Sequence, residues 1–543
     1  MNKKIILTTL FFILLSISLN PLLTYANFNK TQNSYSQSIV TSSNTIWVPD
    51  NYTTIQEAIN NADEEETVFV RAGTYYEHVV VDKALSLIGE NKRNTTIDGN
   101  GTGTVVSIIA NNIILSDFTV QNGELGIWLG HSDNNVLSGN NALNNQYGIY
   151  LWGSDNNTFS GNNASGNTYG IYFSGSDNNV LSGNNALNNQ YGIYLSFSSN
   201  SILSGNIASN NLDGIHFDGS GYNALTGNTV FSNNDDGIFL YYSRHNILTG
   251  NTATKNSRYG IRLSSSSNNA IFHNNFINNT EPLSGTHSVD SWDNGVEGNY
   301  WSDYYGTDAN WDGIGDTPYS IDINNKDNYP LMAIFQQFKI TTKSRSYNIY
   351  AVCDSIISNF QYARAQAVSF KLNGTEGEGF CRITIPHALI EPPHTTTVDH
   401  NPPAYLKTVQ TNETHTWLYF TYDPTEHEVT IAHTFSIEQL VLSHWTIIGL
   451  TIIIAVLLLI SIRYYRMYTK QKKVIQAYER ELGSFPVTHP ERARARFIKD
   501  VIERKEKIET FKKKYGIKIQ PASTFEDLMN KMGVEKEKNR VKH

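Results

Sequence analysis

Residues 134–151, NNVLSGNNALNNQYGIYL, recur letter for letter at residues 178–195. They belong to a longer series, because a Gly-Ile step recurs at intervals of 22, 22, 22, 22, 23 and 23 residues, at Gly126, Gly148, Gly170, Gly192, Gly214, Gly237 and Gly260. Each unit has two short apolar runs, such as VLSGN and GIYL, separated by Asn, Gly and Ser. A fixed period of this size indicates a repeat architecture. Units of short strands without a helix predict the rungs of a parallel β-helix in an all-β fold.

Alignment of the rungs gives columns with distinct roles, because successive side chains of a strand point to opposite faces. The Ile that follows each Gly and the Leu or Phe two residues later are predicted to fill the core. A third column of asparagines is predicted to be buried, with each amide hydrogen-bonded to the next rung. It runs through Asn140, Asn162, Asn184, Asn206, Asn228, Asn251 and Asn274.

The outward neighbours of the Ile column are mostly aromatic. They are Trp128, Tyr150, Tyr172, Tyr194, His216, Phe239 and Arg262. Rungs about 4.8 Å apart would set these side chains in a line. One interpretation is a ligand-binding strip on which sugar rings stack. The alternative is a structural ladder whose members support each other across strands.

Charged residues interrupt the neutral repeat in its later rungs. The candidates for catalysis are Asp213, His216, Asp218, Asp235 and Asp236, with Arg244, His245, Lys255, Arg258 and Arg262 nearby in sequence. Paired carboxylates beside His or Arg are typical of glycoside hydrolases, lyases and epimerases. Sugar binding, calcium binding or plain surface charge are the alternatives for this patch.

A second acidic motif, DANWDGIGD, offers oxygen ligands at Asp308, Asn310, Asp312 and Asp316. This spacing starts like a calcium loop. The twelfth position, which is Glu in an EF-hand, is Tyr319, so the motif is not an EF-hand. A shorter structural Ca²⁺ loop and a metal-free Asx-rich turn both fit the pattern.

The two ends of the repeat carry the most specific motifs. VPDNYTTIQEAINNA includes a capping box, Thr54-x-x-Glu57, and predicts a short capping helix. Together with VFVRAGTYYEHVVV, the rungs themselves and the closing GNYWSDYYGTDANWDGIGDTPYSI, it resembles NosD-type β-helix proteins of the carbohydrate-binding and sugar-hydrolysis (CASH) group. The resemblance covers about residues 46–332 and implies a right-handed parallel β-helix on an exported protein, often archaeal and surface-bound.

Two activities that this resemblance suggests find little support in the residues. Copper handling needs Met, His or Cys ligands, and the predicted external part offers Met332 and scattered histidines. The opening also resembles pectin methylesterases, but the Gly-x-x-Asp-Phe-x-Phe-Gly segment of that family has no match here.

Residues 336–440 alternate in β fashion and predict a small β-sandwich. The proline-rich PPHTTTVDHNPPAYL is expected to be a loop, because proline is excluded from central strands. Cys353 and Cys381 are the only cysteines of the chain. Either a disulfide between them or two buried thiols fits an exported protein.

Residues 1–26 resemble a secretory signal, and residues 445–462 form an uninterrupted apolar run long enough to span a bilayer. Residues 463–543 carry 22 Lys and Arg against 11 Asp and Glu, whereas the rest of the chain carries 19 against 39. The positive-inside rule therefore predicts a type I protein in the cell membrane, with the basic tail in the cytoplasm. The acidic exterior argues against nucleic acid as a partner.

The predicted organisation is a signal peptide (1–26), a linker (27–45), a β-helix with its N-terminal cap (46–280), a C-terminal cap with the Asp-rich loop (281–335), a β-sandwich stalk (336–440), a transmembrane helix (445–462) and a basic helical cytoplasmic tail (463–543). The sequence favours recognition of extracellular or envelope polysaccharide without catalysis. The alternatives are a polysaccharide-active enzyme that uses the acidic patch, and a structural surface spacer. The cofactor expected at most is structural Ca²⁺, and the partner of the tail is unknown.

Overall fold

The computed structural model describes residues 45–286, 289–342, 345–363, 367–373, 377–423, 425–434, 437–482 and 513. The chain divides into two units, Met1–Thr434 and Phe435–His543. The predicted signal peptide, the linker up to residue 44 and nearly all of the predicted tail beyond residue 482 lie outside the described residues.

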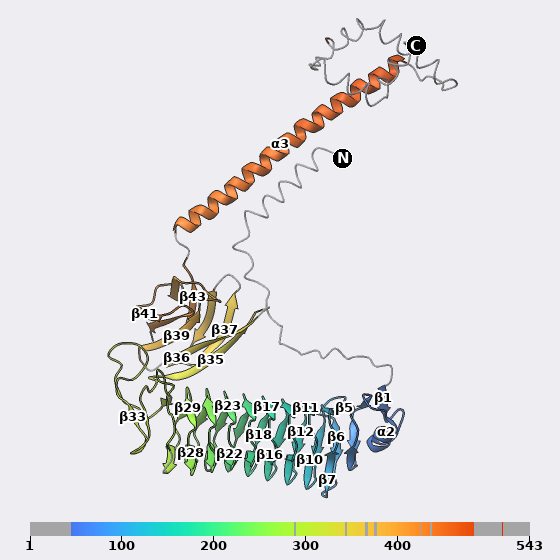
Figure 1. Ribbon diagram of the computed structural model, residues 1–543, viewed down its shortest axis with the longest axis vertical. Coiled ribbons are helices and arrows are strands. Elements are labelled where there is room, and N and C mark those ends of the chain that lie inside the picture. Colours follow the sequence, from blue (N-terminus) through green and yellow to red (C-terminus); the bar gives the residue numbers. More distant parts are fainter. Residues whose placement is uncertain are drawn as a thin grey trace, which may run out of the picture. The chain divides into compact units, whose positions relative to one another are not determined.

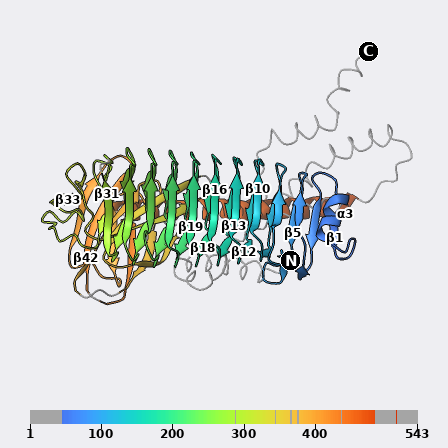
Figure 2. The ribbon, with the colours of Figure 1, turned by 90° about the horizontal axis from the view of Figure 1, so that it is seen from below.

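The first unit contains a parallel β-solenoid of three sheets whose strands follow one another rung by rung (Figure 1; Figure 2). Sheet A comprises β1 (Thr45–Val48), β2 (Thr67–Val70), β5 (Ser86–Gly89), β8 (Ile114–Ser116), β11 (Val136–Ser138), β14 (Thr158–Ser160), β17 (Val180–Ser182), β20 (Ile202–Ser204), β23 (Ala224–Thr226), β26 (Ile247–Thr249) and β29 (Ala270–Phe272). Sheet B comprises β3 (Gly73–Tyr75), β6 (Thr95–Asp98), β9 (Thr119–Gln121), β12 (Asn141–Leu143), β15 (Asn163–Ser165), β18 (Asn185–Leu187), β21 (Ile207–Ser209), β24 (Thr229–Phe231), β27 (Thr252–Thr254), β30 (Asn275–Ile277) and β32 (Tyr300–Trp301). Sheet C comprises β4 (Val79–Val81), β7 (Thr104–Ile108), β10 (Leu125–Gly130), β13 (Tyr147–Trp152), β16 (Tyr169–Ser174), β19 (Tyr191–Ser196), β22 (Asp213–Asp218), β25 (Ile238–Tyr241), β28 (Tyr259–Ser264) and β31 (Glu281–Thr286).

The register follows the repeat. Ile127 pairs with Ile149 and Ile149 with Ile171, and the same columns continue to Ile261. These isoleucines and the Leu or Phe residues two positions later are at most 1% exposed. The predicted core columns are therefore confirmed. Sheets B and C also extend past residue 280, through β31 and β32.

Buried asparagines bind the rungs together, and the predicted column is confirmed. In each rung the side-chain oxygen accepts the backbone N–H of the rung before it, as Asn184 does for Asn162 at 3.0 Å. Three further buried ladders run alongside, which the sequence analysis did not identify. They run through Asn135, Asn157, Asn179, Ser201, Asn223, Asn246 and Asn269; through Asn145, Asn167, Asn189, Asn211, Asn233, Asn256 and Asn279; and through Ser132, Ser154, Ser176, Ser198, Ser220, Ser243 and Ser266.

Caps close both ends of the solenoid core. At the start, α2 (Ile55–Asn61) begins after Thr54, whose hydroxyl accepts the backbone N–H of Glu57 at 3.2 Å, and the helix buries Ile55, Ala58 and Ile59. At the other end, the predicted asparagine ladder passes through Asn299 and stops at the buried Asp327, which accepts the N–H of Asn299 at 2.7 Å. Asp327 lies on β34 (Lys326–Asp327), which pairs with β33 (Tyr319–Ser320). A carboxylate therefore terminates the amide column.

The rest of the first unit is an antiparallel β-sandwich. One sheet orders β35 (Ile334–Thr341), β36 (Ser346–Cys353), β39 (Gly379–Pro386), β42 (His415–Tyr422) and β41 (Leu406–Thr411), and the other orders β37 (Ile357–Ala363), β38 (Ala367–Leu372), β43 (His427–His433) and β40 (His394–Val398). Residues from both sheets share one core. Cys353 and Cys381 form a disulfide between β36 and β39.

The proline-rich segment differs from expectation. His394–Val398 forms strand β40, where the sequence predicted a loop. β40 is an edge strand that pairs with β43 alone, and the prolines lie on either side of it. Proline therefore bounded a strand here without preventing it.

The described part of the second unit is mainly one helix, α3 (Ile437–Leu482). Its segment Ile452–Lys473 is long and apolar enough to cross a membrane. This segment overlaps the predicted span 445–462 and ends later along the chain.

Candidate functional site

The outward face of sheet C carries three parallel columns of side chains. The first contains Tyr147, Tyr169, Tyr191 and Asp213. The second is the predicted column of Trp128, Tyr150, Tyr172, Tyr194, His216, Phe239 and Arg262, and its members do pair rung by rung. The third contains Trp152, Ser174, Ser196, Asp218 and Tyr241. The first column escaped the sequence analysis, although each of its tyrosines directly precedes the repeated Gly-Ile step.

The rings of this face stack on one another. Tyr147 and Tyr169 have centroids 4.8 Å apart and planes 4° apart, and Tyr169 and Tyr191 follow at 5.0 Å and 14°. In the second column Tyr194 stacks on His216 at 4.5 Å, and Arg262 covers the ring of Phe239 at 4.4 Å. Much of each ring face is thus covered by its neighbour, as the structural-ladder interpretation expects. Half-buried edges and hydroxyl groups are left toward the outside.

The phenol groups of the second column lean over the third. Tyr150 hydrogen-bonds Ser174, and the Asp218 carboxylate lies close enough to Tyr194 to affect its titration. Burial raises the pKa of Tyr194, and Asp218 raises it further. These tyrosines are therefore neutral hydrogen-bonding groups at physiological pH. Trp152 and Tyr241 flank the two small serines and are 48% and 38% exposed.

The fold does not require aromatic residues at outward positions. Between β11 and β27, Phe231 is the one aromatic side chain at the outward first and third positions of the strands of sheets A and B. The others there are Ser, Thr, Asn, Ala or aliphatic residues. Since all three sheets share the same rung spacing, the concentration of rings on sheet C is a property of that face.

An acidic cluster ends the tyrosine column. Asp213, Asp235 and Asp236 each offer a carboxylate oxygen, and these three atoms lie within 4.8 Å of one another. Asp213 and Asp236 are buried, and Asp235 is partly exposed. Of the described residues, they form the one such group of three acidic, His or Cys side chains.

Three basic groups border this cluster. His216 Nδ1 lies 3.0 Å from Asp213 Oδ2, Arg262 Nη1 lies 3.3 Å from Asp236 Oδ2, and Arg258 Nη1 lies 3.4 Å from Asp235 Oδ1. Burial raises the pKa of Asp236 to about 6; Asp235 and Asp213 add to this effect, and Arg262 opposes it. The structure therefore brings together four of the five predicted catalytic candidates.

Asp218 is the candidate that lies apart. It occupies the third column, at the far end of β22 from Asp213, beside Tyr194 and Tyr241. His245, which is near the cluster in sequence, stacks on Tyr222 instead. Proximity along the repeat was thus a poor guide to which side chains share a column.

The change of period from 22 to 23 residues marks the position of the cluster. Three residue steps separate the ladder asparagine from the following glycine in the rung of Asn211 and Gly214, whereas four separate Asn233 from Gly237. The extra residue falls in the turn that holds Asp235 and Asp236. This signal was available in the sequence, and locating the insertion within the rung would have singled out this turn.

The predicted calcium loop has its carboxylates engaged with its own backbone. Asp308 accepts the N–H groups of Asp312 and Gly313 at 3.0 and 2.8 Å. Asp312 accepts that of Ile314, and Asp316 accepts that of Ala309. Burial raises the pKa of Asp308, which these backbone bonds counteract. The contacts are those of an Asx-rich turn, and Ca²⁺ binding by the loop stays a prediction.

This loop also contacts the β-sandwich. The ring of Trp311 lies 5.2 Å from that of Tyr405, and Lys407 Nζ donates to the carbonyl of Asn310. Residue Asn310, predicted as a ligand, thus takes part through its backbone in a contact between the cap and the sandwich.

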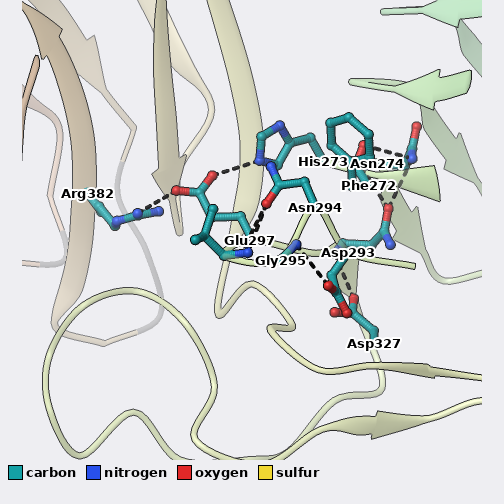
Figure 3. Close-up of polar contacts among 11 residues, drawn as sticks. Phe272, His273, Asn274, Asp293, Asn294, Gly295, Glu297, Asp327 and Arg382 are labelled. Atoms are coloured by element: carbon teal, nitrogen blue, oxygen red, sulfur yellow. Dashed lines mark hydrogen bonds and ion pairs between the residues drawn. The ribbon is translucent and has the colours of Figure 1, made fainter. Parts of the chain in front are cut away.

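A buried ion network joins the cap of the solenoid to the sandwich (Figure 3). His273 and Arg382 approach Glu297 from opposite sides, with His273 Nε2 2.7 Å from Oε2 and Arg382 Nη2 2.5 Å from Oε1. All three side chains are about 10% exposed. Burial would raise the pKa of Glu297, but Arg382 and His273 outweigh it and lower the pKa to about 2. With little access to solvent, this network is structural.

The depressed pKa of Glu297 predicts an acid-sensitive contribution to stability. A carboxyl group with a lower pKa in the folded state stabilises the protein above its unfolded pKa, near 4.5, and loses that contribution as pH falls toward 2. A shift of this size corresponds to about 3 kcal/mol. We expect the urea midpoint of the full chain to fall between pH 5 and 2.5, and to fall less in Glu297→Gln. An equally steep fall in the variant would contradict the assignment.

Comparison with known proteins agrees with the solenoid architecture. Residues 149–306 match the family model of the periplasmic copper-binding protein (NosD), and residues 84–211 match that of the right handed beta helix region. No curated protein sequence matches the chain significantly.

Solved structures show more distant similarity. ORF18 of Geobacillus virus E2 is 15% identical with a TM-score of 0.40, covering 60% of this chain and 69% of its own. An alginate lyase from Paenibacillus sp. str. FPU-7 is 14% identical with a TM-score of 0.34, covering 45% and 98%. The mannuronan C-5 epimerase AlgE6 A-module from Azotobacter vinelandii is 17% identical with a TM-score of 0.33, covering 44% and 93%. TM-scores below 0.5 carry no information about activity. From the two family models and the parallel solenoid, the chain is a right-handed β-helix repeat protein of the NosD type.

Proposed function

We propose that the outward face of sheet C binds polysaccharide, and that it does so by recognition without catalysis. The observation that carries this proposal is the confinement of aromatic side chains to one of three sheets with the same rung geometry. A purely structural spacer would have no need for this asymmetry.

The chemistry of the face suits sugars. From Tyr147 to Tyr194 its first two columns are uncharged, and every rung offers two half-buried tyrosines. A tyrosine presents an apolar ring edge beside a hydroxyl that donates or accepts a hydrogen bond. Carbohydrates display the same mixture of apolar C–H and hydroxyl groups. The linear arrangement along the solenoid favours a polymer over a single sugar.

A glycan panel tests this proposal. We expect the full chain in detergent to bind one or more neutral or acidic polysaccharides saturably, because a continuous face of ring edges and hydroxyls can contact several sugar units at once. Binding is measured on immobilised glycans, with the released products analysed in parallel. Absence of binding to every glycan would favour the structural spacer and contradict the proposal.

One observation favours catalysis as the second candidate. The contact between Asp213 and His216 and the raised pKa of Asp236 place an ionised carboxylate near a carboxyl group that titrates at about 6. Such a pair is suited to general acid–base chemistry. New reducing ends or unsaturated sugars in the panel, lost in Asp213→Asn and retained in Asp218→Asn, would replace recognition by a hydrolase or lyase activity.

We further propose that α3 anchors the protein in the cell membrane, with the β-helix and sandwich outside and the basic tail in the cytoplasm. The apolar segment Ile452–Lys473 and the surplus of positive charge after residue 462 support this orientation. Protease added to intact cells is expected to remove the β-helix and spare a C-terminal tag.

A further inference from the structure

We propose that Asp213, Asp235 and Asp236 hold a divalent cation of the calcium class, at the turn where the repeat lengthens by one residue. This inference is independent of glycan binding. It rests on the geometry of three carboxylates, on an unsatisfied buried oxygen and on the surroundings of the cluster.

The spacing of the three carboxylates matches one shared ion. Oxygen atoms that bind the same Ca²⁺ at about 2.3–2.6 Å lie at most about 5 Å apart, and here the three oxygens lie within 4.8 Å of one another. Three like charges at this separation repel each other strongly where solvent is largely excluded. A cation between them would remove that repulsion.

An independent observation points into this cluster. The side chain of Asp236 is fully buried, and its Oδ1 atom has no hydrogen-bond partner among the described residues. Buried carboxylate oxygens are nearly always satisfied, and an exception calls for an ion or another bound group. Its other oxygen faces Arg262 at 3.3 Å, which is long for a charge-assisted hydrogen bond.

The neighbouring basic groups leave room for the ion. Arg258 and Arg262 approach the outer oxygens at 3.4 and 3.3 Å, and His216 Nδ1 is occupied by Asp213. The remaining donors are therefore carboxylate oxygens, which suit Ca²⁺, Mg²⁺ or Mn²⁺ better than Cu²⁺ or Zn²⁺. The partial exposure of Asp235 gives the ion a route to solvent and space for water ligands.

The contrast with the other acidic motif is informative. In the loop of residues 308–316 the carboxylates accept backbone N–H groups. In the cluster, Asp213 Oδ1 receives one such bond, from Asp236 at 3.3 Å, and Asp236 Oδ1 receives none. Local backbone bonds thus stabilise the loop without a cation, and they do not do so for the cluster.

Terbium luminescence tests the proposal on the full chain in detergent. Tb³⁺ substitutes for Ca²⁺ and emits when a nearby tyrosine is excited, and Tyr191 pairs directly with Asp213. We expect saturable Tb³⁺ emission that Ca²⁺ displaces. Asp235→Asn, at the partly exposed position, should weaken binding at least tenfold, and Asp213→Asn should do the same.

Two variants separate this site from other sources of binding. Asp218→Asn removes a carboxylate from the same strand outside the cluster, and Asp308→Asn removes one from the loop; both should keep the emission that Asp235→Asn loses. Retention of wild-type binding in Asp235→Asn and Asp213→Asn, loss of all emission in Asp308→Asn alone, or no saturable emission at all would each overturn the proposal.

Discussion

Replacement of Asn184 by alanine is expected to destabilise the solenoid by about 2–6 kcal/mol. The Asn184 side chain accepts the backbone N–H of Asn162 and donates to the carbonyl of Phe159, both at 3.0 Å, and all three groups are buried. Alanine would leave these two backbone groups unsatisfied, at about 1–3 kcal/mol each. The urea midpoint of the full chain, followed by far-UV circular dichroism, measures the loss.

The adjacent Asn185 provides the matched control. It is the same residue type one position along the chain, but it points outward and is partly exposed. Asn185→Ala should change the unfolding free energy by no more than about 0.5 kcal/mol, as is usual for surface positions. Equal effects of the two substitutions would show that the amide ladder is not what holds the rungs together.

Replacement of Arg382 by methionine is expected to cost about 3–5 kcal/mol, because it leaves the buried Glu297 without its guanidinium partner. The loss should appear as a lower urea midpoint at neutral pH. A second change, Glu297→Gln, removes the orphaned charge and should restore at least half of the lost stability. This recovery would identify uncompensated charge, and not lost packing of the arginine stem, as the main cause.

Lys371→Met is the control for this substitution. Lys371 and Glu426 are joined at 2.7 Å, but their side chains are 44% and 63% exposed. Exposed ion pairs contribute about 0–1 kcal/mol. A loss below 1 kcal/mol for Arg382→Met, similar to that of Lys371→Met, would contradict the view that the Glu297 network fastens the cap to the sandwich.

The network also affects how the protein should be divided for experiments. Phe335 stacks on His273 at 4.3 Å, and its backbone exchanges two hydrogen bonds with the Asn275 side chain. A fragment that ended near residue 335 would expose these contacts and Glu297. The solenoid, its cap and the sandwich up to Thr434 belong together in one compact unit.

The solenoid was predictable because its period repeats the same physical problem in every rung. Apolar residues at Ile127, Ile149 and their equivalents can be buried in one register, and the period of 22 residues fixes which side chains stack. The amide column of Asn140 to Asn274 followed from the same alignment. The parallel ladders were as readable, and they were missed because only one asparagine per rung was aligned.

The candidate site was less predictable, since it depends on side-chain orientation. Sequence spacing placed Tyr150, Tyr172 and Tyr194 in one column but could not show whether their faces or their edges point outward. It also grouped Asp218 with Asp213, although the length of strand β22 separates them. The contact of Glu297 with Arg382 joins residues 85 positions apart, and no local pattern reports it.

The central claim is that sheet C is the binding face, and affinity for the best glycan of the panel tests it most directly. The triple variant Tyr150→Ser, Tyr172→Ser and Tyr194→Ser gives the second column the side chain found at Ser174 and Ser196. A control variant, Ile202→Ser and Ile247→Ser, removes two exposed apolar side chains from sheet A. We predict at least tenfold weaker binding for the tyrosine variant, equivalent to about 1.4 kcal/mol, and a change below twofold for the control. Equal affinity of the tyrosine variant and the unchanged protein would contradict the claim.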